Sequence, residues 1–247
     1  MQNWTTRVYR KEDKVYRGAF QYMRNENTYA EETFDVYRDK KDLTMHYISE
    51  ALVRVTTGEV LNVRVEYIVN KDYIPQYVFV EKIMGKESTQ EVYEYQPKRN
   101  VISYKFTNSN GDEHSEEFNT APRYHITTPT TASSMLFLRS KKFDSNGKNH
   151  YNVIINFNQW EFKEMPKFKG VIVERATLTA EKMSIDGQNV QAVQYRLYDD
   201  TTDFKTGKEP PHVKIFLSVH GGIPYLVRTD DGTKIQIKYL NDFSEKD

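Results

Sequence analysis

The feature that most constrains the fold of this chain is an alternation of apolar and polar residues with a period of two. Within residues 60–67, for example, Leu61, Val63 and Val65 are separated by polar residues. Successive side chains of a β-strand face opposite sides, so this pattern predicts a sheet with one packed face and one solvated face. Parallel strands buried on both faces would read as continuous apolar runs, so we predict an antiparallel sheet. The alternation is clearest in four segments: 60–67, 101–106, 212–220 and 234–239.

Composition and turn residues support the same conclusion. The chain has 18 Tyr and 13 Phe among 247 residues, and aromatic residues favour strands. Clusters of Asn, Asp and Gly recur along the chain, and these residues suit tight hairpin turns. Their spacing predicts about a dozen strands joined by hairpins. The clearest turn signals are Asn25–Asn27, Asp39–Lys41, Thr57-Gly58, Asn70–Asp72, Asn108–Asp112, Asp186-Gly187 and Asp230–Gly232.

Residues 127–140 lack the alternation. This segment begins with Pro and hydroxyl residues suited to a helix start, and Ser134, Phe137 and Leu138 would share one helical face. We therefore predict a mostly β protein: a large, strongly curved antiparallel sheet or open β-barrel with one central α-helix. A single β-rich half-barrel domain is expected over residues 15–243, after a poorly ordered N-terminal segment, 1–14. The polar stretch from Asp199 to Pro211 is expected to be a long loop.

Charge and cysteine content exclude several classes of function. Lys plus Arg and Asp plus Glu both number 35, so the formal net charge is zero, and no nucleic-acid partner is expected. The absence of cysteine excludes disulfides, cysteine-based zinc sites, iron–sulfur clusters and thiol catalysis. No apolar run approaches the ~18 residues of a membrane-spanning helix, so no integral membrane span is expected.

Catalytic motifs are also missing from the sequence. It has no phosphate-binding loop, no nucleophile elbow and no zinc-protease motif. Neighbouring acids such as Glu116-Glu117 would point to opposite faces of a strand, whereas a glycosidase needs two carboxyls facing one another across a cleft. The expectation is a protein that is not an enzyme and has no cofactor or metal, with a pair of distant carboxylates left open as an alternative.

Aromatic residues and methionine suggest a binding site. The alternating Trp160 and Phe162 have their simplest explanation in a sheet core. The functional alternative is that a strongly curved sheet leaves part of its concave face unfilled, and that this hollow accepts an apolar small molecule or lipid. The residues expected to line it are Met135, Phe137, Leu138, Trp160 and Phe162.

Two segments also resemble a known family. Pro129 to Arg139 is followed by a loop and Gly147, and the C-terminal part has an ordered series of short motifs. This order of segments resembles a bacterial exported family of unknown function, whose open half-barrel fold is similar to that of periplasmic lipoprotein carriers. Thr131-Ala132 and Val219-His220 depart from the family pattern, which has an acid at each place. The C-terminal motifs are Lys214–Val219, Gly221-Gly222, Ile223–Arg228, Asp231-Gly232 and Ile235–Leu240.

The resemblance implies a periplasmic or otherwise exported protein whose signal peptide lies outside this sequence. Three functions follow as hypotheses. The first is a non-enzymatic envelope protein that binds a lipid, an acyl chain or a lipidated partner in the concave face. The second is a structural or assembly protein of the cell envelope that binds another protein. The third is a carbohydrate-active enzyme that uses distant carboxylates.

Overall fold

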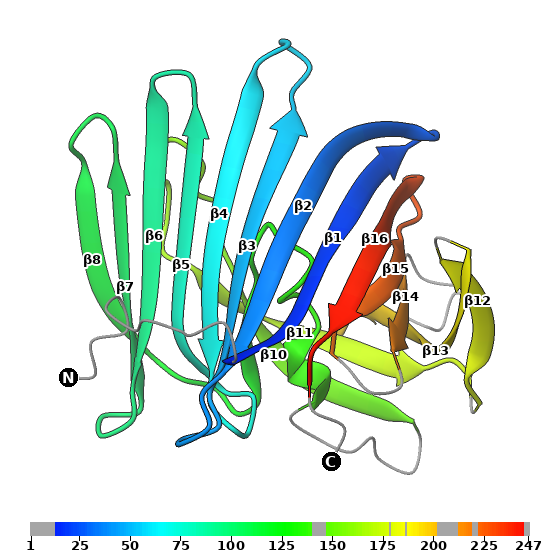
Figure 1. The fold of residues 1–247 in the computed structure, drawn as a ribbon. Coiled ribbons are helices and arrows are strands. Elements are labelled where there is room, and N and C mark those ends of the chain that lie inside the picture. The colour runs from blue at the N-terminus through cyan, green and yellow to red at the C-terminus, as the bar shows by residue number, and fades with distance from the viewer. Residues whose placement is uncertain are drawn as a thin grey trace.

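The computed structural model describes residues 13–139, 147–177, 179–185, 187–201, 212–218 and 222–244 (Figure 1). The N-terminal segment expected to be poorly ordered, 1–14, falls outside this range except for its last two residues. Most of the expected loop between Asp199 and Pro211 lies outside it too, as do Val219, His220 and Gly221.

The first half of the molecule is a meander of eight long strands, each antiparallel to the next. Alternating burial along these strands follows the alternation in the sequence: in β4, Val63, Val65 and Tyr67 are buried. The strands are β1 (Lys14–Arg24), β2 (Asn27–Arg38), β3 (Met45–Arg54), β4 (Val60–Val69), β5 (Pro75–Met84), β6 (Glu87–Gln96), β7 (Val101–Asn108) and β8 (Glu113–Asn119).

The second half continues the same sheet from its other side. The last strand, β16, pairs antiparallel with β1, so the two halves form one sheet whose order is β8-β7-β6-β5-β4-β3-β2-β1-β16-β15-β14-β13-β11-β10-β9, with β12 beside β13. β9 is parallel to β10. The remaining strands are β9 (Tyr124–Ile126), β10 (Lys148–Ile155), β11 (Lys167–Arg175), β12 (Glu181–Ile185), β13 (Gln188–Asp199), β14 (Val213–Ser218), β15 (Pro224–Arg228) and β16 (Thr233–Asp242).

This architecture confirms the prediction of a mostly β protein with a large antiparallel sheet. The sheet of the described residues has sixteen strands, more than the dozen expected, and it does not close, because β8 and β9 stand at its two ends. It is strongly curved (Figure 1). The end strand β9 contacts β5 as well as β10, so the second half folds over the concave face of the first.

Two apolar clusters form the core of the protein. The larger cluster lies on the concave face of the meander and includes Phe20, Tyr67 and Phe106. The smaller cluster lies between β10, β11, β14 and β15, and includes Tyr151 and Val173. Only the larger cluster joins residues of both halves, and burial of its large side chains, each stabilising by roughly 1.5–3 kcal/mol, is the main force that holds the halves together.

The predicted central α-helix is wrong. In residues 127–139, the described part of the predicted helical segment, the chain forms only a four-residue 3-10 helix, η3 (Leu136–Arg139), preceded by turns. Leu136 packs into the larger cluster, whereas its neighbours Phe137 and Leu138 pack into the smaller one. An amphipathic helix presents a single apolar stripe, so it could not serve two cores on opposite sides of the chain. Among the residues described, no helix has the length and apolar character needed to cross a membrane.

Candidate functional site

The residues predicted to line the hollow fall into two groups. Met135, Phe137 and Leu138 are buried together in the smaller cluster, with 3–8% of each side chain exposed. Trp160 and Phe162 lie half-buried elsewhere: the Phe162 ring stacks on His114 at 3.9 Å and packs on Phe106. The structure does not bring the two groups together around one space. Their role in ligand binding stays a prediction.

Part of the expected hollow is occupied by the chain itself, held by a buried glutamate. Glu32 points from β2 into the concave side and is fully buried. Its carboxylate accepts hydrogen bonds from the backbone N–H groups of Thr131 and Ala132, at 2.7 and 3.0 Å, and from the Tyr22 hydroxyl. Burial raises the pKa of Glu32, and these hydrogen bonds oppose the shift. These hydrogen bonds anchor residues 127–139, which we call the crossing segment, to β2.

A second anchor joins β4 to β9. The Tyr67 hydroxyl is 2.9 Å from Nδ1 of His125 and accepts the backbone N–H of Ile126 at 3.1 Å. The two rings stack with centroids 5.4 Å apart. His125 is buried, and burial lowers its pKa to about 3, so the imidazole is neutral at physiological pH.

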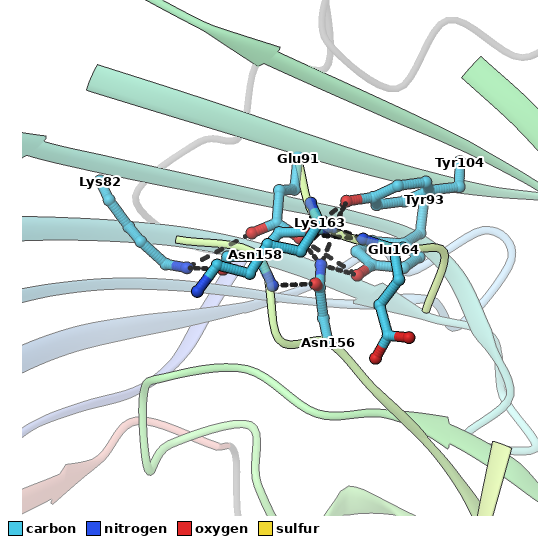
Figure 2. Close-up of polar contacts among 8 residues, drawn as sticks. All are labelled: Lys82, Glu91, Tyr93, Tyr104, Asn156, Asn158, Lys163 and Glu164. Carbon is cyan, nitrogen blue, oxygen red and sulfur yellow. Dashed lines mark hydrogen bonds and ion pairs between the residues drawn. The ribbon is translucent and has the colours of Figure 1, made fainter. Parts of the chain in front are cut away.

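A third anchor is a polar network around Glu91 on β6 (Figure 2). Only 3% of Glu91 is exposed. Its carboxylate accepts hydrogen bonds from the hydroxyls of Tyr93 and Tyr104, at 3.2 and 3.3 Å, and from the Asn156 amide, and it pairs with Lys82 at 3.3 Å. Burial raises the pKa of Glu91, and the Lys82 ammonium opposes the shift.

Asn158 extends this network into the loop that follows β10 (Figure 2). Its Oδ1 accepts the backbone N–H groups of Lys163 and Glu164, at 2.7 and 3.2 Å, while its amide donates to Glu164 O and to the Tyr104 hydroxyl. The loop is thereby fixed against the concave face of β5–β7. Because the polar atoms of Glu91 are bonded to the protein's own groups, the network holds the chain in place.

A different place on the molecule has free volume. A cavity of about 240 Å³ opens at the end of the sheet where β1 begins and β16 ends. This is many times the ~10–15 Å³ that one water needs. Its apolar wall includes Met45, Tyr47 and the almost fully buried Ile223. We call it the end cavity; it is lined by Val15, Tyr16, Arg38, Leu43, Met45, Tyr47, Asn70, Lys71, Tyr73, Arg139, Gly222, Ile223 and Ser244.

The polar side chains of the end cavity are cationic or hydroxylic, apart from the amide of Asn70. Arg38, Lys71 and Arg139 come from the end of β2, from the β4–β5 turn and from the end of η3, and all three are exposed at the rim. The Arg139 guanidinium lies over the Tyr73 ring, 5.6 Å from its centroid. Burial raises the pKa of the Tyr47 hydroxyl, so it is protonated at neutral pH.

Sequence reasoning missed the end cavity because its residues carry no joint signal. Arg38 and Lys71 stand beside turns, where charged residues are ordinary, and Arg139 and Ser244 are distant in the chain. The sequence analysis included Phe137 and Leu138 of η3 in its predicted site, but not Arg139. Among the described residues, no cluster of three His, Asp or Glu could hold a metal ion.

The fold defines a β-barrel-like protein built on an open sheet. A crystal structure of a β-barrel-like DUF1849 protein from Brucella abortus, a domain of unknown function, aligns with a TM-score of 0.53 and 10% identity, over 94% of this chain and 99% of that one. A DUF1089 family protein from Pseudomonas aeruginosa aligns with a TM-score of 0.48 and 11% identity, over 81% and 89% of the two chains. At 10% identity, the likeness to the DUF1849 protein shows the fold alone. No protein-family model matches the sequence, and no curated protein matches it.

Proposed function

We propose that this protein is a non-enzymatic binding protein that holds a small amphiphilic molecule in the end cavity. The observation that carries the proposal is the composition of that cavity, in which an apolar wall lies beneath a polar rim. Ligand sites are typically concave and largely apolar, with a few convergent polar groups. The proposed site therefore lies at the end of the half-barrel and not at Met135 or Trp160.

The construction of the cavity supports binding by a preformed site. Its walls come from β1, β2 and β3, which strand pairing holds together, and from η3 and the segments that join or flank the strands. A site that needs no rearrangement binds with a smaller entropic cost. The lining includes no Asp, Glu, His or Cys, the residue types that most often act as catalytic acids, bases and nucleophiles. This supports a binding role over catalysis. A place in the cell envelope is part of the proposal and rests only on the family resemblance.

A cavity-filling variant tests the proposal. A Cβ atom at Gly222 would lie 3.0 Å from Arg139 Cγ and 3.6 Å from Leu136 Cδ2, so Gly222→Leu places its side chain against these lining groups. We expect calorimetric titration of octyl phosphate and 1-octanol, below micelle-forming concentrations, to detect binding of at least one compound to the wild type. Gly222→Leu should weaken that binding by about tenfold or more, because the ligand would lose its volume.

Ser115→Leu on the exposed strand β8 is the matched control, and thermal unfolding of both variants reports whether they remain folded. The proposal fails if neither octyl compound binds the wild type, or if folded Gly222→Leu binds as tightly as the wild type does.

A second candidate is the binding of another protein, favoured by the filled concave face. The outer edge of β8 has no strand partner among the described residues (Figure 1). Glu113, Glu116 and Glu117 are exposed on this strand, and charges of this kind discourage random edge pairing. A partner strand that pairs with this acidic edge would need basic side chains. Failure of both octyl compounds to bind a well-folded wild type would favour this candidate.

A further inference from the structure

We propose that the end cavity selects an anionic amphiphile, a molecule with an apolar chain and a phosphate, sulfate or carboxylate group, and that Arg38, Lys71 and Arg139 recognise the anion. This inference rests on the proposed function, because it names the chemistry of the ligand at the same site.

The three cations form a rim of one sign. Within the described part of the chain, Arg38 and Lys71 make no ion pair, and the lining of the cavity includes no carboxylate. Asp242, an acid near the cavity, accepts hydrogen bonds from the backbone N–H of Ser244, at 2.9 Å, and from the Ser244 hydroxyl. Cations gathered at the mouth of an apolar cavity repel one another and produce a positive potential, which a bound anion relieves.

Arg139 is oriented for this role. Its position over the Tyr73 ring restricts the guanidinium, whose planar set of donors matches carboxylate and phosphate oxygens. Tyr16 and Tyr47 lie close enough to Arg139 for its charge to influence their hydroxyls. Burial raises the pKa of both tyrosines, so each hydroxyl keeps its proton and can donate a hydrogen bond to an anion.

The backbone at the cavity gives an independent indication of a functional site. Leu43 and Tyr73 adopt left-handed conformations, with φ of 58° and 59°, and both line the end cavity. Such conformations are unfavourable for bulky residues and tend to occur at functional sites. The turn that contains Tyr73 is held by Asn70, whose Oδ1 accepts the backbone N–H groups of Asp72 and Ile74, at 2.9 and 3.0 Å. The same turn presents Lys71 at the rim.

Four probes separate the contribution of the anionic head group to the affinity from that of the apolar chain. Octyl phosphate, 1-octanol and octyltrimethylammonium share an apolar chain and differ in charge, while inorganic phosphate supplies the anion alone. We expect wild-type protein to bind octyl phosphate about tenfold or more tightly than 1-octanol, and octyltrimethylammonium more weakly than either. Inorganic phosphate should bind much more weakly than octyl phosphate.

Substitutions at the rim assign the effect to residues. Arg38→Gln, Lys71→Gln and Arg139→Met should each weaken octyl phosphate binding by about threefold to tenfold and leave 1-octanol binding within about twofold. Lys86→Gln is the matched control, because Lys86 is an exposed turn lysine at the opposite end of the sheet. It should leave both affinities unchanged. Unfolding by urea confirms that each variant is folded.

The outcomes separate the two proposals. Equal binding of 1-octanol and octyl phosphate overturns anion recognition but leaves the proposed binding function intact. If inorganic phosphate binds as tightly as octyl phosphate, the apolar chain contributes nothing to affinity. That result overturns the proposal of an amphiphilic ligand and supports a site for the anion alone. A loss of octyl phosphate binding in Lys86→Gln that equals the loss in Lys71→Gln overturns the assignment to the rim.

A vesicle experiment identifies the source of the anion. Sedimentation with phosphatidylglycerol vesicles that depends on Lys71 and Arg139 would support a membrane head group as the ligand. Binding of monomeric octyl phosphate without vesicle sedimentation would support a free anionic amphiphile.

Discussion

Single buried polar residues decide how the concave side of this protein is filled. Glu32, Glu91 and Tyr67 project from β2, β6 and β4 onto that side, and each bonds to a segment that arrives later in the chain. Buried polar groups are costly unless their hydrogen bonds are satisfied, so these residues favour one arrangement of the crossing segment over others.

Replacement of Glu91 should reveal the strength of this anchoring. Glu91→Ala removes the acceptor shared by Tyr93, Tyr104 and Asn156 and leaves the Lys82 ammonium unpaired, so we expect a loss of about 2–4 kcal/mol in the free energy of unfolding. Urea denaturation measures it. Glu113→Ala, which breaks an exposed pair with Lys105, should cost less than about 0.5 kcal/mol. Equal losses in the two variants would contradict the role given to Glu91.

The buried His125 should make stability depend on pH. Its pKa is lowered to about 3 in the folded state, against ~6.5 in an unfolded chain. Between these values the unfolded state binds the proton, so the stability present above pH 6.5 is lost as the pH falls toward 3.

His125→Gln replaces the imidazole with an amide that does not titrate, and it leaves the other titratable groups in place. From pH 6.5 to pH 4 the wild type should lose up to about 3 kcal/mol more stability than the variant. Urea denaturation at several pH values measures both curves, and parallel curves would show that His125 does not bind a proton on unfolding.

At the scale of elements, the turns explain why the meander could be predicted from sequence. The β1–β2 hairpin has a two-residue loop, Asn25-Glu26, with φ of 49° and 66°. Two positive values define a type I′ turn, which matches the twist of the strands it joins. Asn suits this conformation, and the cluster Asn25–Asn27 was a turn signal in the sequence. Glu26 does not suit it.

Glu26→Gly should therefore stabilise the protein by about 0.5–1 kcal/mol, because glycine adopts positive φ without steric cost. The β5–β6 turn provides a control. There Gly85 has the positive φ of 60°, and Lys86 is not among the positive-φ residues. Lys86→Gly should bring no stabilisation. Thermal unfolding compares the two, and an equal or larger gain in Lys86→Gly would contradict this explanation.

The crossing segment shows where element prediction failed. Hydroxyl residues and a run of apolar residues in 127–140 are compatible with a helix start, and the sequence contains nothing that reveals two separate cores. Leu136 packs into the larger cluster and Phe137 and Leu138 into the smaller one, and most members of both clusters lie far away in the chain. Local patterns do not encode a partner at that distance.

At the scale of the whole molecule, long-range pairing creates the end cavity. The sheet is continuous because β16 pairs with β1, which brings Ser244 and Ile223 beside Tyr16 and Tyr47. The alternation predicted strands and one packed face, but it did not specify which strands would be neighbours. The fold class could therefore be predicted from the sequence. The cavity could not, because it depends on the pairing of β16 with β1 and on charged residues beside turns.

Methionine methyl groups allow the most direct test of the binding site. Met45 lines the end cavity, whereas Met135 is buried in the smaller cluster. In NMR spectra of protein with labelled methionine methyl groups, saturating octyl phosphate should shift the Met45 signal and give Overhauser contacts between Met45 and the octyl chain, with Met135 unchanged. Contacts at Met135 with an unmoved Met45 signal would place the ligand in the smaller apolar cluster and contradict the account.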